Sequence, residues 1–125
     1  MFEMNKNAIL KKTAILGLFI FVLNVLASIF YWYYTLPWFD LLMHFLGGVF
    51  IAGLAFYLIK KPMNFFVTLL IVIAVGLGWE IFEAGADKFL DTNMQNITDS
   101  LSDLLADIIG GAAGFFYFKK WFSAV

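Results

Sequence analysis

An all-α membrane protein with four transmembrane helices is the fold class that this sequence predicts. The chain has 125 residues, of which 63% are hydrophobic and only 14% are charged. A water-soluble domain of this size cannot bury so much apolar surface. Four apolar runs are each long enough to cross a hydrocarbon core of about 30 Å. The length leaves no room for a second domain, so we expect residues 1–125 to form one helical bundle.

The apolar runs define the expected helices, which cover about residues 13–34, 38–59, 63–84 and 98–118. The first run is longer than the apolar region of a signal peptide, so we expect it to be retained as a helix. Pro37 suits the first turn of the second helix. The aromatic residues between Tyr31 and Trp38 are expected to anchor the outer interface of the membrane. Residues 85–96 form the only sizeable expected loop.

The lysines predict the orientation of the helices. All eight basic residues are lysines, and seven of them lie at one end of the apolar runs: Lys6, Lys11, Lys12, Lys60, Lys61, Lys119 and Lys120. By the positive-inside rule these ends, and therefore both termini, are cytoplasmic. Every acidic residue except Glu3 lies in or beside the opposite ends, together with Lys88. We therefore expect an acidic pocket that opens outward from a bacterial or archaeal cytoplasmic membrane.

Acidic residues recur at helical spacing in three of the apolar segments. Asp99, Asp103 and Asp107 follow one another every four residues, so they form one stripe on a helix. The other two segments carry Asp40 and His44, and Glu80, Glu83 and Asp87. Glycines continue each of these faces, which makes them smooth enough for close helix packing or for a homo-oligomer. The pattern indicates a pocket shared by three helices.

Such acidic residues are costly inside a membrane. An Asp at the bilayer centre costs roughly 2.5 to 3.5 kcal/mol, so four acids cost about 10 kcal/mol, which is comparable with the stability of a whole domain. This insertion cost can be offset in four ways: by water that enters from outside, by protonation of the acids, by a bound cation, or by hydrogen bonds between helices. A capping box of Ser100 and Asp103 offers a purely structural explanation for part of the stripe. It does not explain Asp107, Glu80 or Glu83.

A divalent cation is the expected ligand of this pocket, which combines many carboxylates with one imidazole and no arginine. Oxygen-rich sites suit Mg²⁺, Mn²⁺ or Ca²⁺ better than Zn²⁺. The expected ligands are Asp40, His44, Glu80, Glu83, Asp99, Asp103 and Asp107. For His44, the alternative is a packed, hydrogen-bonded side chain. Because Lys88 is the sole outer base, a phosphate-bearing substrate would be held only through the metal.

The same residues resemble a known family pattern. The motifs are Asp40-x-x-x-His44, Glu80-x-x-Glu83 and Asp103-x-x-x-Asp107-x-x-Gly110. They resemble the VanZ-like membrane proteins and, more closely, the YjdF-type membrane proteins. Leu41, Glu83 and Asp107 depart from the VanZ-like pattern, which has Lys, Gln and Asn there. The resemblance implies a small polytopic membrane protein of the cell envelope; the VanZ-like group is associated with resistance to lipid-bearing glycopeptide antibiotics.

Three functions remain open from the sequence. The first is a metal-dependent enzyme or binding protein that acts on an envelope lipid or cell-wall precursor, with Glu80 or Glu83 as the catalytic general base. The second is a cation or proton transporter, which the absence of ionisable residues from the inner halves of the helices disfavours. The third is a non-catalytic envelope factor whose acids only pack helices. In all three the lipid bilayer is the main partner, and no nucleic acid is expected.

Overall fold

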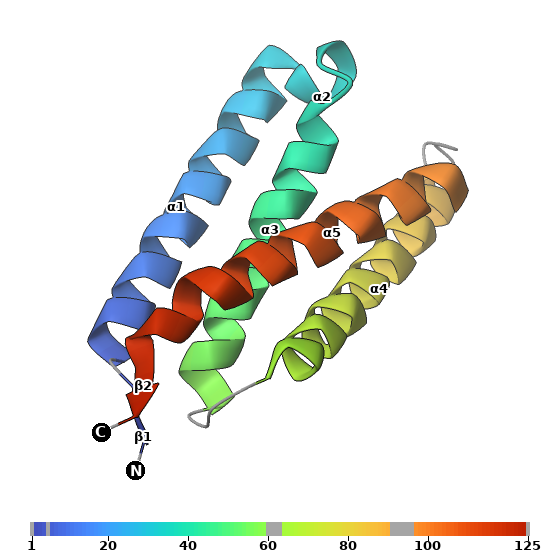
Figure 1. The fold of residues 1–125 in the computed structure, drawn as a ribbon. Coiled ribbons are helices and arrows are strands. Elements are labelled where there is room, and N and C mark those ends of the chain that lie inside the picture. Colours follow the sequence, from blue (N-terminus) through green and yellow to red (C-terminus); the bar gives the residue numbers. More distant parts are fainter. Residues whose placement is uncertain (1, 5, 60–63, 91–96, 125) are drawn as a thin grey trace.

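The computed structural model describes residues 2–4, 6–59, 64–90 and 97–124 (Figure 1). The long helices are α1 (Lys6–Phe30), α3 (Phe39–Ile59), α4 (Phe65–Leu90) and α5 (Ile97–Phe118), joined by the short α2 (Trp32–Thr35) and followed by the 3-10 helix η1 (Lys119–Trp121). The spans long and apolar enough to cross a membrane are Asn7–Phe30, Phe39–Ile59, Phe65–Ala86 and Ser100–Phe118. The predicted all-α class with four candidate transmembrane helices is therefore confirmed.

The two ends of the described chain pair with each other. Strand β1 (Phe2–Met4) runs antiparallel to strand β2 (Phe122–Ala124), with Phe2 opposite Ala124. This short pairing brings both ends to one end of the bundle, and α2 lies at the opposite end (Figure 1). The two termini therefore lie on the same side of the helices.

Two helices, α1 and α4, differ in their bounds from the sequence-based expectation. Helix α1 begins at Lys6 rather than near residue 13, and it ends at Phe30 because Tyr31 has a left-handed backbone with φ of 60°. Lysine is a good helix former, so the basic lead continues the helix beyond its apolar part. Helix α4 continues to Leu90, through a stretch that we expected to be a loop. That stretch, residues 85–90, contains no proline and includes Ala86, a residue type that favours the helix.

The start of α5 removes the proposed capping box. The helix begins at Ile97, so Ser100 already lies inside it and does not occupy the N-cap position. Asp103 is therefore in the body of the helix and is only 3% exposed. A first-turn interaction with the helix dipole does not account for this buried carboxylate.

Glycines allow α3 and α5 to cross closely at the centre of the bundle. A Cβ added at Gly48 would meet the backbone carbonyl oxygen of Asp107, and one at Gly110 would meet the carbonyl oxygen of Phe45. A Cβ at Gly114 would lie 2.7 Å from the Cβ of Ala52. These glycines pack two helices of the same chain, so a homo-oligomer would have to use another surface.

The apolar core lies toward the end that holds the termini. Its buried residues are Ile9, Phe56, Phe115 and Phe118, with the rings of Phe56 and Phe115 5.9 Å apart. The buried acids Glu80, Asp103 and Asp107 gather at the other end, where the first halves of α3 and α5 meet the second half of α4. Helices α1 and α4 lie on either side of α3 (Figure 1). At the end near the termini the buried polar residues among those described are threonines, Thr13 and Thr68, whereas the other end holds buried acids.

Candidate metal centre

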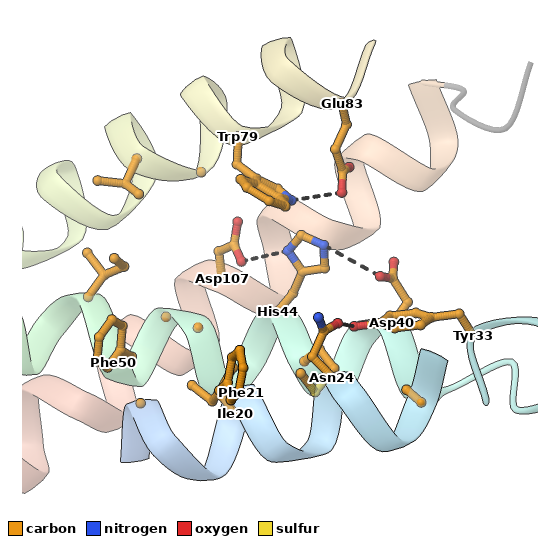
Figure 2. A pocket seen from close by; sticks show the side chains of 18 of the residues that line it. Ile20, Phe21, Asn24, Tyr33, Asp40, His44, Phe50, Trp79, Glu83 and Asp107 are labelled. Carbon is orange, nitrogen blue, oxygen red and sulfur yellow. Dashed lines mark hydrogen bonds and ion pairs between the residues drawn. The ribbon is translucent and has the colours of Figure 1, made fainter. Parts of the chain in front are cut away.

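The imidazole of His44 lies between two buried acids of α5. Its Nδ1 is 3.0 Å from Oδ1 of Asp107, and its Nε2 is 3.3 Å from Oδ2 of Asp103. The His44 side chain is 10% exposed, and those of Asp103 and Asp107 are 5% and 9% exposed. Asp40, one turn before His44, is 47% exposed and approaches Nε2 at 3.8 Å (Figure 2). One ring thus connects acidic side chains of two helices.

Helix α4 adds two more carboxylates to this centre. His44, Glu80, Glu83 and Asp103 each offer one ligand atom, and these four atoms all lie within 4.8 Å of one another. Metal–oxygen distances are about 2.0 to 2.6 Å, so two ligands of one ion lie up to roughly 4 to 5 Å apart. The spacing therefore suits a single shared ion, held from three helices.

Asp107 does not belong to this group of four and faces the other ring nitrogen. A proton on Nδ1 of His44 can be donated to Asp107, which leaves the Nε2 lone pair directed at Asp103, a member of the four-residue cluster. This is how a carboxylate fixes the tautomer of a metal-binding histidine. Because Nε2 and an ionised Asp103 are both acceptors, their 3.3 Å contact requires a proton or a cation between them.

Gly76 makes room for the Asp107 carboxylate. A Cβ at Gly76 would lie 2.6 Å from Oδ2 of Asp107. The spacing from Gly76 to Glu80 places both on one face of α4, so the same face admits one carboxylate and supplies another. Small size at this position is therefore needed for the contact between Asp107 and His44.

Gly76→Ala is expected to displace Asp107 and weaken its hydrogen bond to Nδ1 of His44. Since the chain contains a single histidine, ¹⁵N-histidine labelling gives one pair of ring-nitrogen signals. The native protein should show a protonated Nδ1, and Gly76→Ala should show a mixture of tautomers. Gly78→Ala is the matched control, because a Cβ there meets nothing within 4 Å. An unchanged spectrum for Gly76→Ala would contradict the assigned role of Asp107.

Two aromatic residues contribute polar contacts near the centre. Nε1 of Trp79 donates to Oε1 of Glu83 at 2.8 Å, and the hydroxyl of Tyr33 donates to Oδ1 of Asn24 at 2.8 Å (Figure 2). Burial raises the pKa of Tyr33 above its usual value, and the negative charges of Asp40 and Glu83 raise it further. The Tyr33 hydroxyl therefore stays protonated and lies in the field of both acids.

A large cavity borders the candidate metal centre. Its volume is about 980 Å³, at the upper end of the roughly 300 to 1,000 Å³ typical of ligand sites. Helices α1, α3 and α4 supply most of its walls. The cavity is lined by the acidic residues Asp40, Glu83 and Asp107. Glu80 and Asp103 do not line it. Glu83 and His44 therefore face both the cavity and the buried cluster.

The structure brings together most, but not all, of the site residues predicted from the sequence. His44, Glu80, Glu83 and Asp103 converge, Asp40 lies at the exposed edge, and Asp107 contacts the ring from its other side. Asp99 lies on α5, but its side chain is outside the part of the chain that the structure describes, as are those of Asp87 and Lys88.

The sequence predicts packing for Trp79, which is adjacent to Glu80, and a place at the membrane interface for Tyr33. Both line the cavity, and both make side-chain hydrogen bonds. The spacing of four residues between Trp79 and Glu83 was a usable signal, because such residues are neighbours on a helix. No comparable signal linked Tyr33 to Asn24, since their contact depends on the chain reversal after α1.

These features define a polytopic membrane protein with a buried cluster of acids and one histidine near one end of its helices. A family described as predicted membrane protein (DUF2238) matches residues 1–124, and the chain belongs to this family. No curated protein and no solved structure shows significant similarity to this chain.

Proposed function

We propose that this membrane protein binds a divalent cation between α3, α4 and α5. The observation that carries the proposal is the convergence of four ligand atoms, from His44, Glu80, Glu83 and Asp103, within 4.8 Å. The contact between Asp107 and Nδ1 of His44 supports the proposal, because this contact leaves Nε2 of His44 available as a metal ligand. With three carboxylates and one imidazole, the site suits Mg²⁺, Mn²⁺ or Ca²⁺ better than Zn²⁺.

The cavity gives such an ion access to a substrate. A bound cation polarises a substrate oxygen or lowers the pKa of a bound water. Glu83, which lines the cavity, is the better placed of the two proposed general bases, and Glu80 is the more buried. An envelope lipid or cell-wall precursor at the membrane surface is the proposed substrate class, in line with the resemblance to the VanZ-like and YjdF-type proteins.

Transport of a cation or proton is the weaker alternative. A transport path needs polar groups that continue across the bundle. Among the described residues, the buried core near the termini consists of Ile9, Phe56, Phe115 and Phe118, and the buried polar residues at this end, Thr13 and Thr68, are not ionisable. A purely structural role is the other alternative, in which a proton rather than a metal lies between His44 and Asp103.

Thermal unfolding of the detergent-solubilised protein tests for the cation. Mg²⁺, Mn²⁺ or Ca²⁺ at millimolar concentration should raise the melting temperature, because a ligand of the folded state stabilises it by mass action. A chelator should reverse the shift, and Zn²⁺ should act less strongly. Equal melting temperatures with chelator and with every ion would refute the proposed function.

We expect the metal centre to lie at the outer side of the membrane. The centre and the chain termini are at opposite ends of the bundle, and the lysine distribution predicts cytoplasmic termini. Reporter fusions after Val125 should therefore be active only when the reporter works in the cytoplasm. Fusions within the turn at Leu36 should report the outer side. The reverse pattern would place the centre inside.

A further inference from the structure

The cavity beside the metal centre has two chemically different ends. Its wall is formed at one end by Asn24, Tyr33, Asp40 and Glu83. At the other end the lining residues are apolar and include Ile20, Phe21 and Phe50 (Figure 2). A space that is polar at one end and apolar along the rest matches an amphiphile rather than a fully polar solute.

The cavity is open to the side of the bundle. Helix α1 forms one wall and α4 the other, with α3 as the floor between them. Phe21 of α1 and Trp79 of α4 line the cavity and are 64% and 51% exposed. In a membrane this side faces lipid, so a hydrocarbon chain reaches the cavity without crossing water.

The charges at the polar end favour a positive headgroup. Among the described residues the cavity lining contains Asp40, Glu83 and Asp107 but neither lysine nor arginine. The neighbouring cluster adds Glu80 and Asp103, so five carboxyl groups face a single imidazole, that of His44. An anionic headgroup would increase this imbalance, whereas an ammonium group would reduce it. The rings of Tyr33 and Trp79 are also favourable neighbours for a cation.

We propose that the cavity binds a membrane amphiphile with an ammonium headgroup, placed between Asp40 and Glu83, and with its hydrocarbon chain lying along α3 between α1 and α4. The Tyr33 hydroxyl, whose pKa is raised by burial and further by Asp40 and Glu83, lies in the field of the same two acids. The proposal stands whether or not a metal occupies the neighbouring cluster. Resting on the proposed function, it also names the headgroup chemistry of the envelope lipid on which the protein would act.

Two glycines provide a matched pair of variants for the hydrocarbon part. Gly47 lines the cavity, and a Cβ there would meet nothing within 4 Å. A Cβ at Gly78 would also meet nothing, but Gly78 does not line the cavity. Gly47→Leu should therefore fill the space of the chain, and Gly78→Leu should leave it free. Both changes remove a glycine from a helix interior, so their effects on helix propensity are alike.

Native mass spectrometry in dodecyl maltoside at pH 7 compares hexadecylamine, hexadecyl phosphate and hexadecanol, which differ only in their headgroups. We expect one hexadecylamine per chain, with a Kd at least about tenfold lower than for the other two, which corresponds to one favourable charge contact. Methylammonium, which lacks the chain, should not compete. Gly47→Leu and Asp40→Asn should each raise the Kd about tenfold, whereas Gly78→Leu should leave it unchanged.

The same titration with chelator and with Mn²⁺ separates this proposal from the metal site. Hexadecylamine binding that persists in chelator supports the proposal even if no metal binds. Equal binding of all three amphiphiles, or preferred binding of hexadecyl phosphate with Mn²⁺, would overturn it. So would an unchanged Kd in Gly47→Leu, or a dimer mass with no amphiphile bound, which would assign the cavity to a second copy of the chain.

Discussion

Replacing Gly110 with alanine is expected to destabilise the protein by about 3 kcal/mol, the upper part of the usual range for overpacking. The added methyl group would meet the backbone carbonyl oxygen of Phe45, which cannot move aside as the end of a flexible side chain can. Helices α3 and α5 would have to separate. That separation would also draw Asp107 away from His44, so the metal centre should be lost together with stability. Thermal and denaturant unfolding in detergent measure the first effect.

Gly85→Ala is the control for this prediction. A Cβ at Gly85 meets nothing within 4 Å, and the residue lies inside α4. Alanine should therefore leave the stability unchanged or raise it by roughly 0.5 to 1 kcal/mol, through the lower conformational freedom of the unfolded chain. If Gly110→Ala were as stable as Gly85→Ala, the close crossing of α3 and α5 would be wrong.

Glu80→Gln and Asp103→Asn are expected to abolish stabilisation by a divalent cation. At a cation concentration of 100 times Kd, the native protein should gain about 2.7 kcal/mol. Each substitution keeps the shape of the side chain but removes a charge that attracts the ion to a site of low polarity. The measurement is the shift in melting temperature between chelator and saturating Mn²⁺.

Asp107→Asn is the comparison variant in this series. The amide oxygen still accepts a hydrogen bond from Nδ1 of His44, so most of the cation response should remain. If the acids only pack helices, neutralising Glu80, Asp103 or Asp107 would be harmless or stabilising, because each change removes a desolvation cost. A Glu80→Gln protein that responds fully to the cation would refute the assigned ligands.

Most of the fold was predictable because membrane insertion imposes simple rules on a sequence. The second and fourth predicted helices, 38–59 and 98–118, agree with α3 (Phe39–Ile59) and α5 (Ile97–Phe118) to within one residue at each end. The extension of α4 to Leu90 was missed, because the length of an apolar run does not show how far a helix continues beyond the membrane. The break at Tyr31 was missed because a left-handed tyrosine has no marked sequence signal.

The proposed site was predictable in its members but not in its arrangement. Spacing of four residues placed Asp103 and Asp107 on one face of a helix, and it predicted that Asp40 and His44 are neighbours. It could not show that His44 separates the two acids of α5, one at each ring nitrogen. That arrangement depends on the height at which α3 and α5 cross, which Gly48 and Gly110 set through their contacts with backbone atoms of the other helix.

The cavity is the feature that sequence patterns predicted least. It forms because α1 and α4 lie on either side of α3 (Figure 1), and no residue pattern encodes the distance between α1 and α4. Gly47 illustrates the difference from Gly48. The two are adjacent in the chain, yet a Cβ at Gly48 meets the backbone of α5, whereas one at Gly47 enters open space. Only the structure distinguishes the glycine that packs helices from the glycine that lines a cavity.

Electron paramagnetic resonance of Mn²⁺ bound to the ¹⁵N-histidine-labelled protein tests the central claim most directly. His44 is the single histidine, so any ¹⁵N coupling to the ion identifies its ligand without ambiguity. The account predicts one Mn²⁺ per chain, coupled to one ring nitrogen, and loss of the bound ion in Asp103→Asn and Glu80→Gln. A protein that binds no Mn²⁺, or whose bound Mn²⁺ shows no nitrogen coupling, would contradict it.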